Sequence, residues 1–111
     1  MKLNYTTANS RVTVEFEADT HRELFTQISK FQEVFEETKC GKCGSENLRF
    51  VVRTVDENEY FELRCIDCGA KLAFGSMKKG GGLFPKRKDA DGNWLPDGGW
   101  QKWNPKTKSM E

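Results

Sequence analysis

The most regular alternation of apolar and polar residues lies near the start of the chain, over residues 11–18. Every second residue there is apolar: Val12, Val14, Phe16 and Ala18. Successive side chains of a strand point to opposite faces of a sheet, so this period of two predicts a strand with one buried face. Residues 1–10 are polar without such a pattern, and either a short edge strand or a frayed end fits them.

The pattern then changes to helical spacing. Thr20 and Glu23 stand in the S/T-x-x-E relation of a capping box, which predicts that a helix starts there. Up to about Thr38, the apolar residues fall on one stripe of that helix: Leu24, Ile28, Phe31 and Phe35, flanked by Phe25 and Val34. We predict that the stripe packs over a sheet shared by the first strand and the strands that follow. A partner groove or a cofactor site is the alternative.

A hairpin pattern follows in the middle of the chain. Residues 48–55 are rich in β-branched and aromatic side chains, residues 56–59 form a polar turn, and residues 60–64 return as a second strand. We predict a third short strand over residues 71–74.

Residues 76–111 have a different composition. Their three tryptophans, Trp94, Trp100 and Trp103, stand among glycine, proline, asparagine and lysine, and such a segment does not build a core by itself. We predict a C-terminal arm that follows a domain of residues 1–75. Its tryptophans either fill the small core or stack on unpaired bases. We expect Trp94 to be buried and Trp100 and Trp103 to stack.

The charge distribution adds to this picture. The net charge is +1, but residues 75–111 carry eight Lys or Arg against four Asp or Glu, and the preceding residues carry ten against thirteen. A basic end on an acidic body favours a nucleic-acid partner, although basic tails also serve solubility. Because only 36% of the residues are hydrophobic, the core must be small, and a metal ion is a common means of stabilising such chains.

The cysteines supply the most specific motif. Cys40 and Cys43 form one C-x-x-C pair, Cys65 and Cys68 form another, and a glycine follows each pair. Two thiolates in a tight turn can bind one metal ion, and two such turns complete a tetrahedron that leaves no position for water. We therefore predict a structural zinc site. Disulfides, a redox pair and unrelated buried cysteines are alternatives. No signal-peptide pattern follows Met1, and the second pair has no part in a redox site.

The order knuckle, hairpin, knuckle and strand over residues 40–75 resembles a zinc ribbon. With the predicted helix and arm, the fold class is α+β: a small antiparallel sheet with a four-cysteine zinc ribbon, one packed amphipathic helix and a basic, Trp-rich arm. The whole layout resembles small accessory proteins of bacteriophage replication and recombination regions, some of which are single-stranded DNA-binding proteins. Zinc ribbons also serve as protein-docking modules.

Together these features predict a zinc-stabilised protein that binds single-stranded nucleic acid, DNA in preference to RNA, with little sequence specificity. A replication or recombination protein is a further expected partner. The alternative is a protein-docking module of a replication or transcription complex. We expect no enzyme, because no spare cysteine nucleophile and no open metal position are present. We also expect a cytoplasmic protein without a membrane span, because no apolar stretch is long enough for one.

The residues expected to contact nucleic acid come from one ribbon strand and from the arm. Arg49 and Arg53 are four residues apart on a predicted strand and therefore point to the same face. The full set is cationic and aromatic: Arg49, Arg53, Lys78, Lys79, Phe84, Lys86, Arg87, Lys88, Trp100, Lys102 and Trp103.

Overall fold

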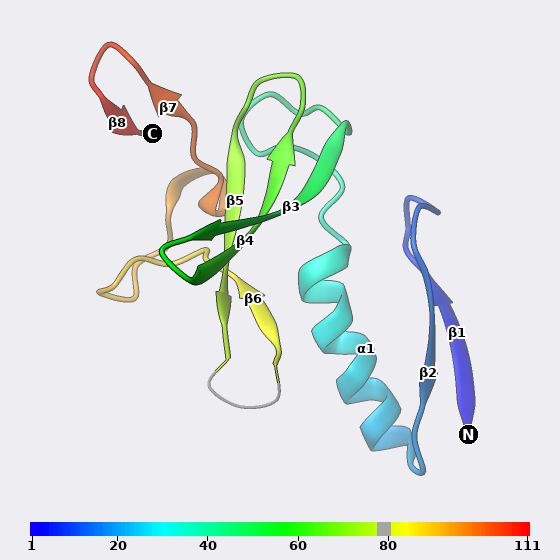
Figure 1. The fold of residues 1–111 in the computed structure, drawn as a ribbon. Helices are drawn as coiled ribbons and strands as arrows, with labels where there is room; N and C mark the ends of the chain where they lie inside the picture. Colours follow the sequence, from blue (N-terminus) through cyan, green and yellow to red (C-terminus); the bar gives the residue numbers. More distant parts are fainter. Residues whose placement is uncertain (78–80) are drawn as a thin grey trace. The chain divides into compact units, whose positions relative to one another are not determined.

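The computed structural model of this chain describes residues 1–77 and 81–111. The described residues form one α-helix and antiparallel sheets, so the fold class is α+β as predicted (Figure 1). The chain divides into two compact units, Met1–Thr38 and Lys39–Glu111. Composition led us to predict a boundary after residue 75, whereas the internal contacts group the residues after it with the ribbon.

The N-terminal unit is a β-hairpin with a helix packed on it. Its elements are β1 (Lys2–Thr6), β2 (Thr13–Glu17) and α1 (His21–Phe35). The antiparallel register sets Leu3 opposite Phe16 and Tyr5 opposite Val14, so these apolar side chains share one face of the hairpin. The alternation seen in the sequence is therefore confirmed. The polar residues before it form the partner strand.

The helix begins and packs as its sequence pattern predicts. The N–H of Glu23 donates to the Thr20 hydroxyl at 3.2 Å, which confirms the cap. The Phe31 ring meets the rings of Tyr5 and Phe16 edge-on, with centroids 5.9 and 5.5 Å away, and stacks on Phe35 at 4.6 Å. The apolar stripe of the helix is thus the core of this unit.

The predicted sheet shared by the first strand and the ribbon is wrong. β2 pairs with β1 in a separate two-stranded sheet. The reason lies in residues 7–12, which turn the chain back so that β1 already satisfies the backbone hydrogen bonds of one edge of β2.

The second unit contains the ribbon sheet, drawn in green to yellow in Figure 1. Its strands are all antiparallel and follow the order β3-β4-β5-β6. Their bounds are β3 (Leu48–Val55), β4 (Asn58–Cys65), β5 (Lys71–Ser76) and β6 (Leu83–Pro85). The three predicted strands are confirmed. The fourth strand, β6, was not predicted, because it has only three residues and ends in a proline. The proline is tolerated because β6 lies at the edge of the sheet.

The turn between β3 and β4 is shorter than predicted. Only Asp56 and Glu57 lie between the two strands, and both have positive φ, at 50° and 69°. Such two-residue turns match the twist of a hairpin. The strands therefore extend further than the polar composition of residues 56–59 indicated, and every cross-strand pair is set by this turn.

The two faces of the ribbon sheet differ. Paired residues of an antiparallel sheet share a face, so Leu63 and Leu72 lie together, as do Phe61 and Phe74. We call this the covered face, since Leu63, Leu72 and Phe74 are buried. The opposite face carries Arg64 beside Lys71 and is called the cationic face.

The C-terminal segment packs against the covered face. It contains a short 3₁₀ turn (Pro96–Gly99) and a small hairpin of β7 (Trp103–Asn104) and β8 (Ser109–Met110). Gly99 has a φ of 96°, and a Cβ there would lie 2.4 Å from the carbonyl oxygen of Lys86 and 3.2 Å from the Leu72 side chain. Only a glycine allows so close an approach, so this turn fixes where the next residue, Trp100, goes.

Trp100 is buried and Trp94 is exposed, which reverses our prediction for these two tryptophans. Trp100 is 2% exposed, whereas Trp94 is 71% exposed. The tight turn at Gly99 directs Trp100 into the core of the unit. Trp94 instead lies under the ammonium group of Lys88, which is 4.6 Å from its ring.

Candidate metal centre and cationic sheet face

Four cysteine sulfurs converge at one end of the ribbon sheet. Cys40 and Cys43 come from the turn before β3, and Cys65 and Cys68 come from the end of β4 and the turn after it. All four Sγ atoms lie within 4.8 Å of one another, and none is in a disulfide. The Cys40–Cys68 and Cys43–Cys65 sulfur distances are 3.6 and 3.5 Å. A tetrahedral ion with metal–sulfur bonds of about 2.3 Å needs sulfurs about 3.8 Å apart, so the four residues are positioned to hold one metal ion.

The two knuckles have matching backbones. Gly44 and Gly69 follow the cysteine pairs with φ of 76° and 79°, and their N–H groups donate to the carbonyls of Cys40 and Cys65 at 2.9 and 3.0 Å. The positive φ confirms why a glycine follows each pair. Backbone N–H groups also point at the sulfurs, since Lys42 donates to Cys40 Sγ at 3.3 Å and Ala70 to Cys68 Sγ at 3.4 Å.

The four neighbouring thiols influence one another's pKa values. The N–H of Ser45 lowers the pKa of Cys43, but the neighbouring thiols and burial outweigh it and raise that pKa to about 12. Burial raises the pKa of Cys65, but N–H donors and the Cys43 thiol outweigh it and lower that pKa to about 7. Four adjacent thiolates repel one another, so full ionisation of this cluster requires a cation among them.

Trp100 packs against the first knuckle. A Cβ on Gly41 would lie 2.5 Å from the carbonyl oxygen of Asp97 and 2.6 Å from Trp100 Cδ1, so the C-terminal segment rests directly on this turn. Lys42 Nζ pairs with Asp97 Oδ2 at 2.6 Å across the same contact. The predicted stacking of Trp100 on bases is wrong, because its ring is enclosed here.

The cationic face gathers basic side chains from three neighbouring strands. The register aligns Arg49 with Arg64 and Arg64 with Lys71 in one row across β3, β4 and β5. The uninterrupted pairing of β3 also confirms that Arg49 and Arg53 point to the same face. Among the described residues, no carboxylate lies within ion-pair distance of Arg49.

One carboxylate lies in the middle of this face. Glu62 is 4% exposed, and its Oε1 accepts from Arg53 Nε and, at 3.4 Å, from Arg64 Nη2. Lys71 Nζ lies 3.8 Å from its Oε2. Burial raises the pKa of Glu62, but Arg53, Arg64 and Lys71 outweigh it and hold that pKa below its usual value. Four cations against this one carboxylate leave the cluster with a net charge of +3.

Exposed aromatic rings lie on the same face. Tyr60 is paired with Arg53, whose guanidinium carbon is 5.4 Å from the ring centroid. Phe84 of β6 is paired with Gly75 and is also exposed. Phe84 was among the predicted residues, but Tyr60, Glu62 and Lys71 were not. The signal that could have found Tyr60 and Glu62 is the length of the turn. A turn of two residues at Asp56–Glu57, in place of the predicted four, gives the register that brings both into this cluster.

The remaining predicted basic residues are dispersed along the C-terminal segment. Arg87 donates to the carbonyl of Gly98 at 2.6 Å and is half-buried, so it supports the turn at Gly99. Lys86 is exposed, and Lys88 lies over Trp94. Lys78 and Lys79 lie outside the described residues.

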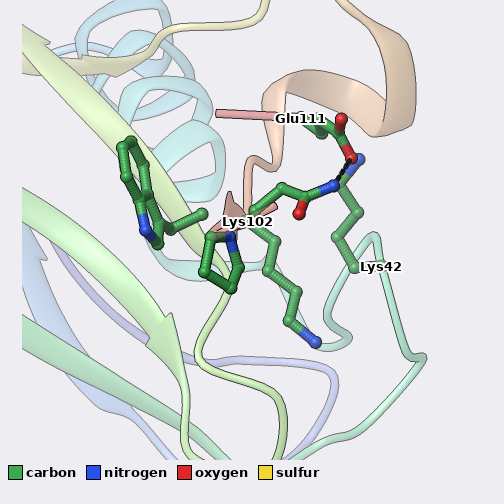
Figure 2. Close-up of a pocket in the computed structure, with 6 residues that line it drawn as sticks. Lys42, Lys102 and Glu111 are labelled. Atoms are coloured by element: carbon green, nitrogen blue, oxygen red, sulfur yellow. Dashed lines mark hydrogen bonds between the residues drawn. The ribbon is translucent and has the colours of Figure 1, made fainter. Parts of the chain in front are cut away.

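Lys102 and Trp103 line a shallow pocket of about 350 Å³. Figure 2 shows it, with Lys42, Asn104, Pro105 and Glu111 as the other lining residues. The side chains of Lys42 and Lys102 end on different sides of the pocket (Figure 2), and Lys42 is already paired with Asp97. The pocket therefore joins an aromatic ring to cations, but its two ammonium groups do not converge on one point.

Within the part of the chain that the structure describes, no helix has the length and apolarity needed to cross a membrane. Comparison of the chain with protein-family models, with curated proteins and with solved structures gives no match.

Proposed function

We propose that this protein is a zinc-stabilised binder of single-stranded nucleic acid. The observation that carries the proposal is the cationic face, where three cations surround one buried carboxylate, a fourth cation lies beside them and two aromatic rings remain exposed. Zinc bound by the four cysteines would stabilise the fold of this sheet.

Zinc is the metal that the ligand set favours. Four thiolates in a tetrahedron suit zinc or an iron–sulfur cluster, and two C-x-x-C turns closed by glycine are typical of zinc ribbons. The short distances between the sulfurs leave room for a single ion rather than for a larger cluster. A metal so enclosed has no position for water or substrate, so we propose a binding protein and not an enzyme.

Single-stranded nucleic acid fits the cationic face better than duplex does. Cations neutralise phosphates in any nucleic acid, but an exposed ring such as Tyr60 can stack only on a base that is not already stacked and paired. Neither feature reads base edges, so little sequence preference is expected. DNA and RNA present the same two groups to this face, and DNA remains our first choice.

The docking alternative rests on a different observation. On the outer edge of the covered face, Phe50 and Val52 are 55% and 59% exposed. Adjacent exposed apolar side chains are a feature of protein interaction sites. A docking module would use this edge and would need no affinity for oligonucleotides.

The test is a salt titration of binding between the zinc-loaded protein and a fluorescently labelled single-stranded oligonucleotide. Each phosphate contact contributes about −0.7 to the slope of log affinity against log salt, so the row of Arg49, Arg64 and Lys71 predicts a slope near −2. Duplex of the same sequence should compete poorly. Absence of binding at low salt would overturn the proposal and favour the docking module.

A further inference from the structure

The cationic face is ordered into rows that run across the strands. In one row the register brings together Arg49, Arg64 and Lys71, and Lys71 is in turn bridged to Gln101. A second row contains Arg53 and Tyr60 on β3 and β4 and Phe84 on β6. The first row is cationic, and the second row ends in two aromatic rings.

Gly75 makes the aromatic row continuous. Extending the pairing of β4 with β5 by one residue places Gly75 beside Tyr60, and Gly75 is paired with Phe84 on its other side. A Cβ at Gly75 would lie 2.5 Å from the Phe84 ring, so this ring leans over β5 toward Tyr60. Any larger residue at this position would push the ring away.

The distance from the charged groups of the first row to the aromatic row matches the build of a nucleotide. The two rows are four residues apart along each strand, about 14 Å in an antiparallel sheet, and Glu62 stands midway, about 7 Å from the aromatic row. The side chains of Arg64 and Lys71 bring their charged groups to 3.4 and 3.8 Å from Glu62. A base and its own phosphate are held apart by one sugar, a separation of the same scale. Between the rows lie the small side chain of Ala73 and the buried Glu62, whose contacts fix Arg53 and Arg64 in place.

From this arrangement we infer that single-stranded nucleic acid crosses the β-strands of the ribbon, with its bases over the row of Tyr60 and Phe84 and its phosphates along the row of Arg49, Arg64 and Lys71. The inference rests on the proposed function and assigns each row one chemical group of the ligand. The two rows should then fail in different ways when they are altered.

The experiment compares two labelled oligonucleotides of equal length, oligothymidylate and the same backbone without bases, over a range of salt. Each ring should contribute roughly tenfold to the affinity for oligothymidylate and little to that for the abasic chain. Tyr60→Leu, and Gly75→Ala through displacement of Phe84, should therefore remove much of the preference for bases with the salt slope unchanged.

The cationic row should give the opposite result. Arg49→Gln and Lys71→Gln should weaken binding of both oligonucleotides alike and make the salt slope shallower by about 0.7 each. Phe50→Leu, on the same sheet but on the covered face, is the matched control for Tyr60→Leu. Melting temperature and zinc content should be the same in all variants that are compared.

Three results are informative against the inference. If wild-type protein binds both oligonucleotides equally with a steep salt slope, the row assignment is wrong while nucleic-acid binding stands. If Tyr60→Leu shifts the salt slope as Arg49→Gln does, the two rows do not have separate roles. If neither oligonucleotide binds, both the proposed function and the inference are wrong.

Discussion

The two faces of the ribbon sheet show how one small sheet can divide stability from binding. The covered face buries Leu63 and Leu72 and receives the C-terminal segment at Gly99. The cationic face buries Glu62 at its centre and leaves Arg49 and Tyr60 exposed around it. Changes on the covered face should therefore act mainly on folding, and changes at the exposed residues of the cationic face mainly on binding.

Removal of the metal should have the largest effect and should abolish the distinction between the faces. A structural zinc site contributes on the order of ten kcal/mol of folding free energy, more than a small core can replace. Chelation, or Cys65→Ser, should therefore unfold the ribbon sheet and abolish oligonucleotide binding. Circular dichroism and zinc analysis measure this, and an unchanged spectrum after complete zinc removal would contradict it.

Trp100→Ala should be the next most damaging change. The ring is buried between the first knuckle and the core, and truncation of such a side chain costs about 3–5 kcal/mol. The matched control is Trp94→Ala, whose exposed ring should change stability by less than about 0.5 kcal/mol. Chemical denaturation followed by circular dichroism compares the two variants. Equal losses would mean that the two tryptophans are not as different as their exposure indicates.

Glu62→Gln should reduce stability by a smaller amount, about 1–3 kcal/mol, because Arg53 and Arg64 lose their charged acceptor. The pKa of Glu62 is lowered on folding, so the carboxylate stabilises the native state above its ordinary pKa of 4.5, and this contribution is lost as the pH falls through the lowered pKa. The gap in stability between wild type and Glu62→Gln should therefore narrow in acid. A gap that stays constant with pH would show that the charge is not its source.

Phe50→Ser should have the smallest effect. This side chain is exposed on the outer edge of the covered face, so stability should change by less than about 0.5 kcal/mol and oligonucleotide affinity should remain as it was. Fluorescence titration measures the affinity. A loss of oligonucleotide binding would show that the binding surface includes the covered face, contrary to the proposal.

The parts of the fold that short sequence patterns specify could be predicted. The spacing of Cys40, Cys43 and their counterparts predicted two facing knuckles, since a tight turn and a following glycine are local requirements. The positions of Arg49 and Arg53 on one face followed from the period of two along a strand.

The errors arose where distant segments decide the outcome. The burial of Trp100 depends on the close approach of Gly99 to Lys86 and on the absence of a side chain at Gly41, neither of which appears in the composition around the tryptophan. The alternation of apolar residues over residues 2–6 is too short to predict β1. Without β1 as its partner, β2 was expected to pair with the ribbon strands. The clustering of Tyr60 with Arg53 required the exact length of one turn.

The most direct test of the account is ultraviolet cross-linking of the zinc-loaded protein to single-stranded oligothymidylate, followed by mass spectrometry of the linked peptides. Cross-links form at rings that stack on bases, so the account predicts Tyr60 and Phe84 as the linked residues, with competition by unlabelled single-stranded oligonucleotide and little by duplex. Cross-links confined to Phe50, Trp94 or Trp103 would contradict it.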